Sequence, residues 1–116
     1  MRIPTHREPT HPGEMLLEEF LLPMEITQPE LAAAIHVPYH IINQIINKNQ
    51  VITPNIALRL AKFFGLSEDF WLNLQLRWDL YQAKKSEQVE LETIKPFISK
   101  ELLSLSIAPS FESAQF

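Results

Sequence analysis

The segment QPELAAAIHVPYHIINQIIN, from Gln28 to Asn47, predicts the fold of this chain. Apolar residues lie at helical spacing on both sides of a break near residues 36–38. They are Leu31, Ala32, Ile35, Val37, Ile42, Ile45 and Ile46. The pattern predicts two short helices joined by a tight turn, with the small Ala32 where their axes come closest, which is a helix-turn-helix. Such a unit holds its second helix outward, where it can enter the major groove of DNA.

Helical spacing continues outside this segment and predicts five helices in all. We expect them over residues 12–22, 28–35, 38–47, 54–64 and 67–85. Pro23 is predicted to stop the first helix, and Thr27 with Glu30 is predicted to form a capping box at the start of the second. The other predicted cap residues are Thr53, Gly65 and Ser67. The chain is therefore predicted to be an all-α, five-helix domain, an arrangement that resembles lambda-repressor-like domains.

The pattern changes after Ser86. Residues Val89–Thr93 alternate apolar and polar side chains, which predicts a short strand-like extension. Because the sequence offers no second strand, we expect this one to pair with its copy in a second subunit and to clasp a two-fold dimer. The predicted organisation is an N-terminal arm over 1–12, a helix-turn-helix DNA-binding domain over 13–85, and a C-terminal dimerisation and tail segment over 86–116.

The helix predicted over 67–85 carries more apolar side chains than one small core can bury. They include Leu72, Leu74, Leu76, Trp78 and Leu80. A helix that is apolar on two faces usually buries the second face against a partner. This surplus favours a homodimer in which the same helix lies at the subunit contact.

Length, charge and composition restrict the class of protein. The 116 residues are enough for one domain, and the net charge of −4 divides into −1 for residues 1–85 and −3 for residues 86–116. Between residues 27 and 53 the only charges are Glu30 and Lys48, which predicts weak nonspecific attraction to DNA and a larger role for neutral donors. There is no cysteine, no signal-peptide core, and no window near the roughly 18 apolar residues of a membrane span, so we expect a cytoplasmic protein with no membrane partner.

The helix predicted over 38–47 has an outward face rich in amide and aromatic side chains. Asn and Gln pair bidentately with adenine, and an Ile side chain can contact the methyl group of thymine. The residues that we interpret as base-reading are Tyr39, His40, Ile41, Asn43 and Gln44. The alternative is a plain solvated helix face, although exposed Ile and Tyr side chains are unusual on such a face.

Three further residues are candidates for contacts with DNA phosphates. Gln28 is at the start of a helix, where the backbone amides and its own side-chain amide can hold a phosphate. Asn47 ends the predicted base-reading helix and Lys48 follows it, and Lys48 is the one cation of this region. The alternative for Gln28 is a helix-start residue with no role in binding.

The sequence shows no constellation for catalysis. It lacks a Ser/His/Asp or Cys/His set, a glycine-rich phosphate loop and a paired-carboxylate arrangement. His36 and His40 are four residues apart, but a turn lies between them and no carboxylate or third ligand is near in sequence, while His6 and His11 lie on the arm. We therefore expect no enzymatic activity, no cofactor and no metal site.

Four separated motifs resemble the HigA-type antitoxins, within the larger family of XRE/Cro-like helix-turn-helix regulators. They are HPGEML at 11–16, the cap over 27–31, ITPNIALRLAKFFG at 52–65 and SEDFWLNLQLRWDLYQA at 67–83. The resemblance covers about residues 11–97. It implies a dimer that binds double-stranded operator DNA to repress its own operon and that neutralises a HigB-like, RNA-cleaving toxin.

The chain departs from the family pattern at three places. His36 stands in the inter-helix turn where Gly is usual, and His tolerates positive φ better than most residues. Pro38 stands at the start of the base-reading helix in place of Ser or Thr, so the helix start is kept without a side-chain cap. The stretch Asn47-Lys48-Asn49-Gln50 replaces an Asn-Gly-Lys-Arg-like loop, so one basic residue and one glycine are missing.

Two other functions fit the same sequence. The first is a protein-interaction module that neutralises a toxin without binding DNA, which the acidic balance and the reduced basic loop favour. The second is a stand-alone phage-type repressor, which the identity of the adjacent gene would distinguish from an antitoxin.

Overall fold

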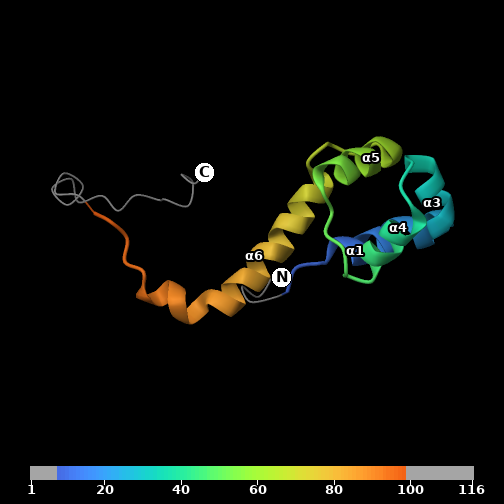
Figure 1. Cartoon of the computed structure of the whole chain (residues 1–116). Coiled ribbons are helices and arrows are strands. Elements are labelled where there is room, and N and C mark those ends of the chain that lie inside the picture. The colour runs from blue at the N-terminus through green and yellow to red at the C-terminus, as the bar shows by residue number, and fades with distance from the viewer. Residues whose placement is uncertain (1–7, 99–116) are drawn as a thin grey trace, which may run out of the picture. The chain divides into compact units, whose positions relative to one another are not determined.

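The computed structural model describes residues 8–98, and this part of the chain is helical and contains no strand (Figure 1). Its N-terminal helix runs without interruption through α1 (Pro12–Met15), the π-helical segment η1 (Leu16–Leu21) and α2 (Leu22–Met24). The helices that follow are α3 (Gln28–Ile35), α4 (Tyr39–Ile46), α5 (Pro54–Phe64) and α6 (Phe70–Thr93). Because α1, η1 and α2 form one helix, the predicted all-α fold with five helices is confirmed.

The chain divides into two compact units, one ending at Ser86 and one beginning at Glu87. In the first unit, α3 packs against α4 and α5, and α1 packs against α4. The side chains with no solvent exposure are Leu16, Leu31, Ile42, Ile45, Ala57, Leu60 and Trp71. They come from the N-terminal helix and from α3, α4, α5 and α6, so one core fixes the helix-turn-helix on the rest of the unit.

The backbones of α1 and α4 come into direct contact at Gly13. A Cβ atom at this position would overlap the carbonyl oxygen of Ile45 and would lie 2.9 Å from the Cα atom of Ile46. Only glycine, which has no side chain, permits this approach. The HPGEML motif therefore places the start of α1 directly on the last turn of α4.

Four helices end with a residue in the left-handed conformation. Their φ angles are 57° at Glu25, 61° at His36, 66° at Lys48 and 71° at Gly65. In each case the next N–H donates to a carbonyl five residues back, at 2.8–3.0 Å, which is the long bond of a Schellman motif. The predictions of Gly65 as a left-handed stop and of positive φ at His36 are confirmed. The other three left-handed residues carry a Cβ atom, which raises the energy of this conformation by about 1 kcal/mol each.

The N-terminal helix does not stop at Pro23, so that prediction is wrong. The helix continues through Pro23 to Met24, and its π-helical segment lies directly before the proline. The helix ends instead where Glu25 adopts its left-handed conformation.

Thr27 and Glu30 form the predicted capping box at the start of α3. The Glu30 N–H donates to Thr27 Oγ1 at 3.1 Å, and the Thr27 N–H donates to Glu30 Oε1 at 2.8 Å. Thr53 is at the N-cap position of α5 as predicted, but its hydroxyl donates to Asn55 Oδ1 and makes no capping bond.

Ser67 is not the cap of α6, contrary to prediction. Its hydroxyl donates to Asp69 Oδ1 at 3.0 Å, and the helix begins at Phe70. Residues 67–70 instead form a turn, closed by the Phe70 N–H donating to the Ser67 carbonyl at 3.1 Å.

Residues Val89–Thr93 are helical, so the prediction of a strand, and of a helix that ends at Lys85, is wrong. The alternation of apolar and polar residues is only five residues long. Its neighbours on both sides are good helix formers, and no glycine or proline intervenes before Pro96. α6 therefore continues to Thr93, and the strand clasp that was expected to hold a dimer does not form.

Within the described residues, no helix combines the length and the apolar character that a bilayer crossing requires.

Candidate nucleic-acid interface

Helix α4 turns one face to the core and the other to solvent. Ile42 and Ile45 are fully buried, whereas Tyr39, His40 and Gln44 are exposed. Pro38 precedes the helix as its N-cap, with φ −58° and ψ 143°, so α4 begins one residue later than predicted. The buried isoleucines thus fix the direction in which the exposed side chains project.

The other predicted base-reading residues lie at the edges of this exposed face. Ile41 is half-buried and packs against the core. Asn43 is also half-buried, and it lies one turn from both Tyr39 and Asn47. The face therefore consists of three exposed side chains bordered by one apolar and one amide side chain.

A chain of side-chain amides joins the start of α3 to the end of α4. Asn43 Nδ2 donates to Gln28 Oε1 at 3.1 Å, and Asn47 Nδ2 donates to Asn43 Oδ1 at 3.1 Å. The Tyr39 hydroxyl lies 3.5 Å from Asn43 Nδ2, at the outer limit of a hydrogen bond. The structure thus brings Gln28, Asn43 and Asn47 together, although Gln28 and Asn47 were predicted to contact phosphates and Asn43 to contact a base.

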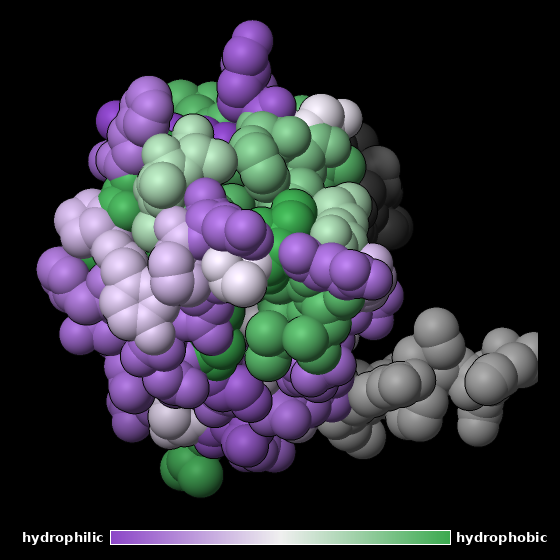
Figure 2. All heavy atoms as spheres, turned by 90° about the vertical axis from the view of Figure 1, so that its right-hand side faces the viewer, coloured by the Kyte–Doolittle hydropathy of each residue, from purple (hydrophilic) through white to green (hydrophobic). Residues whose placement is uncertain are grey.

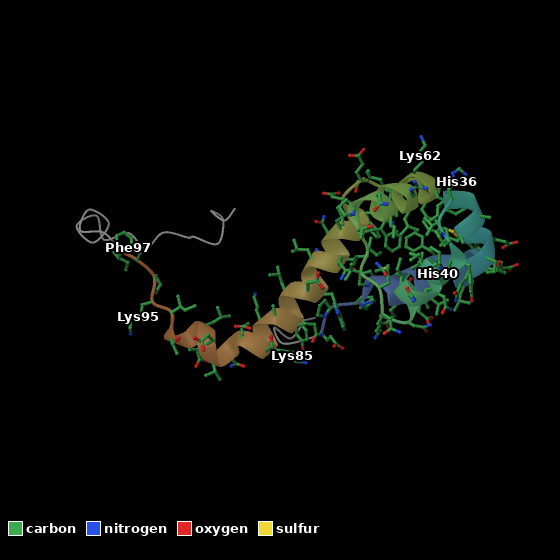
Figure 3. All side chains as sticks on the ribbon, in the orientation of Figure 1. His36, His40, Lys62, Lys85, Lys95 and Phe97 are labelled. Carbon is green, nitrogen blue, oxygen red and sulfur yellow. The ribbon has the colours of Figure 1, made fainter. Side chains whose placement is uncertain are left out.

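The turn between α3 and α4 is held by a residue that sequence reasoning missed. Arg59 of α5 donates from Nη1 to the carbonyl oxygens of Ile35 (2.9 Å) and His36 (3.0 Å). These carbonyls end α3, where a cation is favoured by the helix dipole. Figure 3 shows His36 at this end of α3 and Lys62 on the neighbouring α5.

An open groove of about 500 Å³ lies between α3 and α5, beside this turn. Ala34, Leu58 and Phe63 line it, together with the cations of Arg59 and Lys62. Figure 2 shows apolar side chains surrounded by polar ones on the side of the molecule that carries α3. Ile35 and His36 complete the lining, and none of the residues around the groove is acidic.

Lys48 follows α4, and its ammonium group lies 5.6 Å from the centre of the Trp78 ring on α6. On α6, Trp78 is half-buried. A cation at this distance over an indole ring is attracted by the ring quadrupole. The predicted phosphate-binding cation is therefore held against α6.

His11 lies on the same indole ring and is buried, although its sequence position suggested an arm. Its ring contacts Trp78 edge-on, with 4.8 Å between ring centres and an angle of 80°. It is the N-cap of α1, and its Nδ1 accepts a hydrogen bond from the Gly13 N–H at 2.8 Å. Burial lowers the pKa of His11, Lys48 lowers it further, and the carboxylates of Glu14 and Asp79 oppose this. His11 is therefore a neutral structural residue at pH 7.

Gln75 fixes the segment that follows α4, and sequence reasoning also missed this role. The side chain is buried on α6, where Oε1 accepts from the Ile52 N–H at 2.9 Å and Nε2 donates to Asp79 Oδ1 at 3.0 Å. A buried amide with both ends bonded is stabilising, and its loss leaves the Ile52 N–H unpaired. The only available signal was a polar residue at an inward position of an apolar helix.

His36 and His40 belong to different helix ends, one closing α3 and one on α4 (Figure 3). Among residues 8–98, no group of three or more His, Asp and Glu side chains is placed to hold a metal ion. The two histidines therefore have no carboxylate or third histidine with which to form a site.

The fold and the outward face of α4 define a helix-turn-helix protein. A family model described as Helix-turn-helix matches residues 17–71. The antitoxin HigA-1 of Vibrio cholerae is 41% identical over 98 residues, which cover 84% of this chain and 92% of the relative. The Pseudomonas aeruginosa antitoxin HigA, solved with the higBA promoter, superposes with a TM-score of 0.74 at 34% identity and covers 78% of this chain and 99% of that chain. The antitoxin GraA, solved in complex with its operator, gives a TM-score of 0.75 at 30% identity over 84% of this chain and 100% of that chain.

The chain therefore belongs to the XRE-type helix-turn-helix family that includes the HigA antitoxins and related transcriptional regulators. This membership confirms the resemblance inferred from the four sequence motifs. The family is non-enzymatic, so the expectation that the chain is not an enzyme is confirmed as well.

Proposed function

We propose that the chain is the cytoplasmic antitoxin and autorepressor of a HigB–HigA-type module, and that it binds double-stranded operator DNA through α3 and α4. The observation that carries this proposal is the outward face of α4, where Tyr39, His40 and Gln44 are exposed over a fully buried opposite face. A rigid helix with exposed amide and aromatic groups is what major-groove recognition requires. The solved relatives bound to a promoter and to an operator support it.

In this proposal, bases are contacted by Tyr39, His40, Ile41, Asn43 and Gln44. The Gln44 side chain is exposed, and its amide makes no hydrogen bond to any described residue, so both of its ends are available to a base edge. Asn43 has two roles in this proposal: it contacts a base, and its amide holds the side chains of Gln28 and Asn47 by hydrogen bonds.

Phosphate contacts are assigned to Gln28, Asn47 and Lys48. Gln28 is the first residue of α3, so its side-chain amide and its own backbone N–H can face the same anion, whereas the Glu30 N–H is bonded to Thr27 and Pro29 has none. The bond from Asn43 to Gln28 ties this phosphate contact to the base-reading face, which would fix the register of the helix on DNA.

We propose a two-fold homodimer as the DNA-binding form, with the DNA-binding domain over 13–85 extended at both ends, because His11 and Pro12 form the cap and first residue of α1 and α6 continues to Thr93. Leu76 and Leu80 are 55% and 48% exposed on one side of α6, and Leu72 lies one turn before them. Pairing this stripe with its copy would bury it. A two-fold pair of α4 helices about 34 Å apart would match successive major grooves of a palindrome.

The toxin of the module is proposed to be a HigB-like, RNA-cleaving protein encoded beside this chain. Co-expression with the neighbouring gene and affinity purification of the chain tests this partner. Recovery of a stoichiometric small protein with ribonuclease activity that the chain suppresses is the expected result.

The DNA part is tested by electrophoretic mobility shift with a duplex of the sequence upstream of the chain's own gene. We expect a dimer to bind this duplex at least 10³-fold more tightly than a shuffled duplex of equal length and composition. Equal binding to both duplexes, or none to either, would reject the repressor function.

Two alternatives correspond to other outcomes. A chain that captures the toxin but binds neither duplex is an interaction module, which the single cation between residues 27 and 53 favours. A chain that binds the upstream duplex but has no toxin gene beside it is a stand-alone phage-type repressor.

A further inference from the structure

We propose that Trp78 is a positioning residue for DNA binding, because its indole ring holds the Lys48 ammonium group at the exit of α4. This inference rests on the proposed role of Lys48 at the DNA backbone. It assigns a function to a residue of α6 that lies outside the helix-turn-helix itself.

Backbone hydrogen bonds alone fix the main chain at Lys48, independently of any contact of its side chain. Its φ of 66° ends α4 in the left-handed conformation. The Lys48 N–H donates to the Ile45 carbonyl at 3.1 Å, and the Asn49 N–H donates to the Gln44 carbonyl at 2.8 Å. The side chain therefore leaves the helix end in one direction, toward α6.

The Trp78 ring also packs against His11. The His11 ring packs edge-on at 4.8 Å, and its Nδ1 is bonded to the Gly13 N–H. The contact of Gly13 with Ile45 sets this histidine beside the last turn of α4. Three segments thus meet at one indole: the start of α1, the exit of α4 and the middle of α6.

The position of the Lys48 ammonium group matters for DNA binding because few other charges lie nearby in the sequence. It is the only cation between residues 27 and 53, so it supplies the local attraction for a phosphate. A lysine on a flexible stem loses more rotamer freedom on binding than one already held against a ring. A side chain restrained by Trp78 binds a phosphate more tightly than a free one.

The test is a double-mutant cycle on the full chain, with affinity for the upstream duplex measured at several salt concentrations. In the wild-type background, Trp78→Leu is expected to weaken binding about threefold, the scale of an exposed cation–π contact. In the Lys48→Ala background the same change is expected to have no further effect. Trp78→Phe, which keeps an aromatic face and most of the packing volume, should restore part of the affinity.

The matched control is Tyr81→Leu on the same helix. The Lys85 ammonium lies 5.3 Å from the Tyr81 ring, so Tyr81→Leu removes a similar cation–aromatic contact whose cation is outside residues 27–53, and DNA affinity should stay unchanged. A structural role for Trp78 would give a different result, because Trp78→Leu would then weaken binding equally in both Lys48 backgrounds. That outcome, or no weakening in either, overturns the inference.

A second measurement separates this inference from the proposed function. In the free protein, NMR should show the Lys48 ε-methylene protons shifted upfield by the indole ring, and the shift should disappear in Trp78→Leu. Absence of the shift in the wild type overturns the inference even if DNA binds. Absence of DNA binding with the shift present rejects the proposed function, and the DNA role of Trp78 with it, while the stack itself stands.

Discussion

The two sides of α4 tolerate substitution to different degrees. On the side of α1, Gly13 lies against the Ile45 carbonyl, and no other residue fits there. On the solvent side, Tyr39, His40 and Gln44 are exposed and could be exchanged without disturbing any buried contact. The buried side therefore sets the free energy of unfolding, whereas substitutions on the exposed side change it little and leave that face available for the proposed recognition of DNA bases.

The largest expected effect is on the buried side. Gly13→Ala should destabilise the chain by about 3 kcal/mol or more, because its Cβ meets backbone atoms that have no rotamer to change. Urea denaturation gives the free energy of unfolding. Gly65→Ala is the matched control: nothing lies within 4 Å of its Cβ, so only the left-handed conformation costs about 1 kcal/mol. Equal losses for the two variants would contradict a backbone contact between α1 and α4.

On the exposed side, Gln44→Ala should weaken binding to the upstream duplex by about 1–3 kcal/mol, the scale of a bidentate base contact. Its free energy of unfolding should stay within about 0.5 kcal/mol of the wild type, as for other exposed sites. Gln88→Ala removes a similar exposed amide from the last turns of α6 and should change neither quantity. Unchanged duplex affinity for Gln44→Ala would remove the base-reading assignment from α4.

In the turn between α3 and α4, a substitution is expected to stabilise the fold and not to destabilise it. His36→Gly should stabilise the chain by about 0.5–1 kcal/mol, because φ of 61° suits glycine better than histidine. Its side chain is exposed, so no packing is lost. A thermal melt that rises for His36→Gly, and likewise for Glu25→Gly at φ 57°, is the expected result. A lower melting temperature for both variants would show that the His36 and Glu25 side chains stabilise the fold by more free energy than the left-handed conformation costs.

The smallest effect is the pH dependence that His11 introduces. Its pKa is lower in the folded chain than the ordinary value of 6.5, so the unfolded chain binds its proton first as pH falls. Stability should be unaffected above about pH 6.5 and should decrease below it. His11→Asn keeps an acceptor for the Gly13 N–H and removes the titration, so its melting temperature should fall less between pH 7.5 and 5.5. Parallel curves for the two proteins would place the pH dependence elsewhere.

Local signals in the sequence were sufficient for much of the fold. Apolar spacing predicts the buried Leu31, Ile42 and Ile45, and Thr27 with Glu30 predicts the capping box. Each of these depends on residues a few positions apart, where helix geometry is the same in every protein. The same locality explains the error at Val89–Thr93, because five alternating residues fit a helix as well as a strand.

The contacts around α4 could not be predicted because they join residues far apart in sequence. His11 meets Trp78, and Gln75 bonds the Ile52 N–H, only once the helices have packed. The outward residues of α4 were predicted from the helical phase of its apolar residues alone. That phase gives a direction for Asn43 but not its bond to Gln28, so positioning and binding could not be separated by sequence reasoning.

The amide chain from Asn47 through Asn43 to Gln28 has a polarity. Each step runs from an NH₂ group to a carbonyl oxygen, so the Gln28 end keeps both of its N–H donors, while the Asn47 end keeps its carbonyl oxygen, as far as the described residues show. Rotating Asn43 alone by 180° would set NH₂ against NH₂ and oxygen against oxygen. The three amides must therefore turn together or not at all, so Asn47 at the exit of α4 helps to keep the Gln28 side chain, at the start of α3, in its donor orientation.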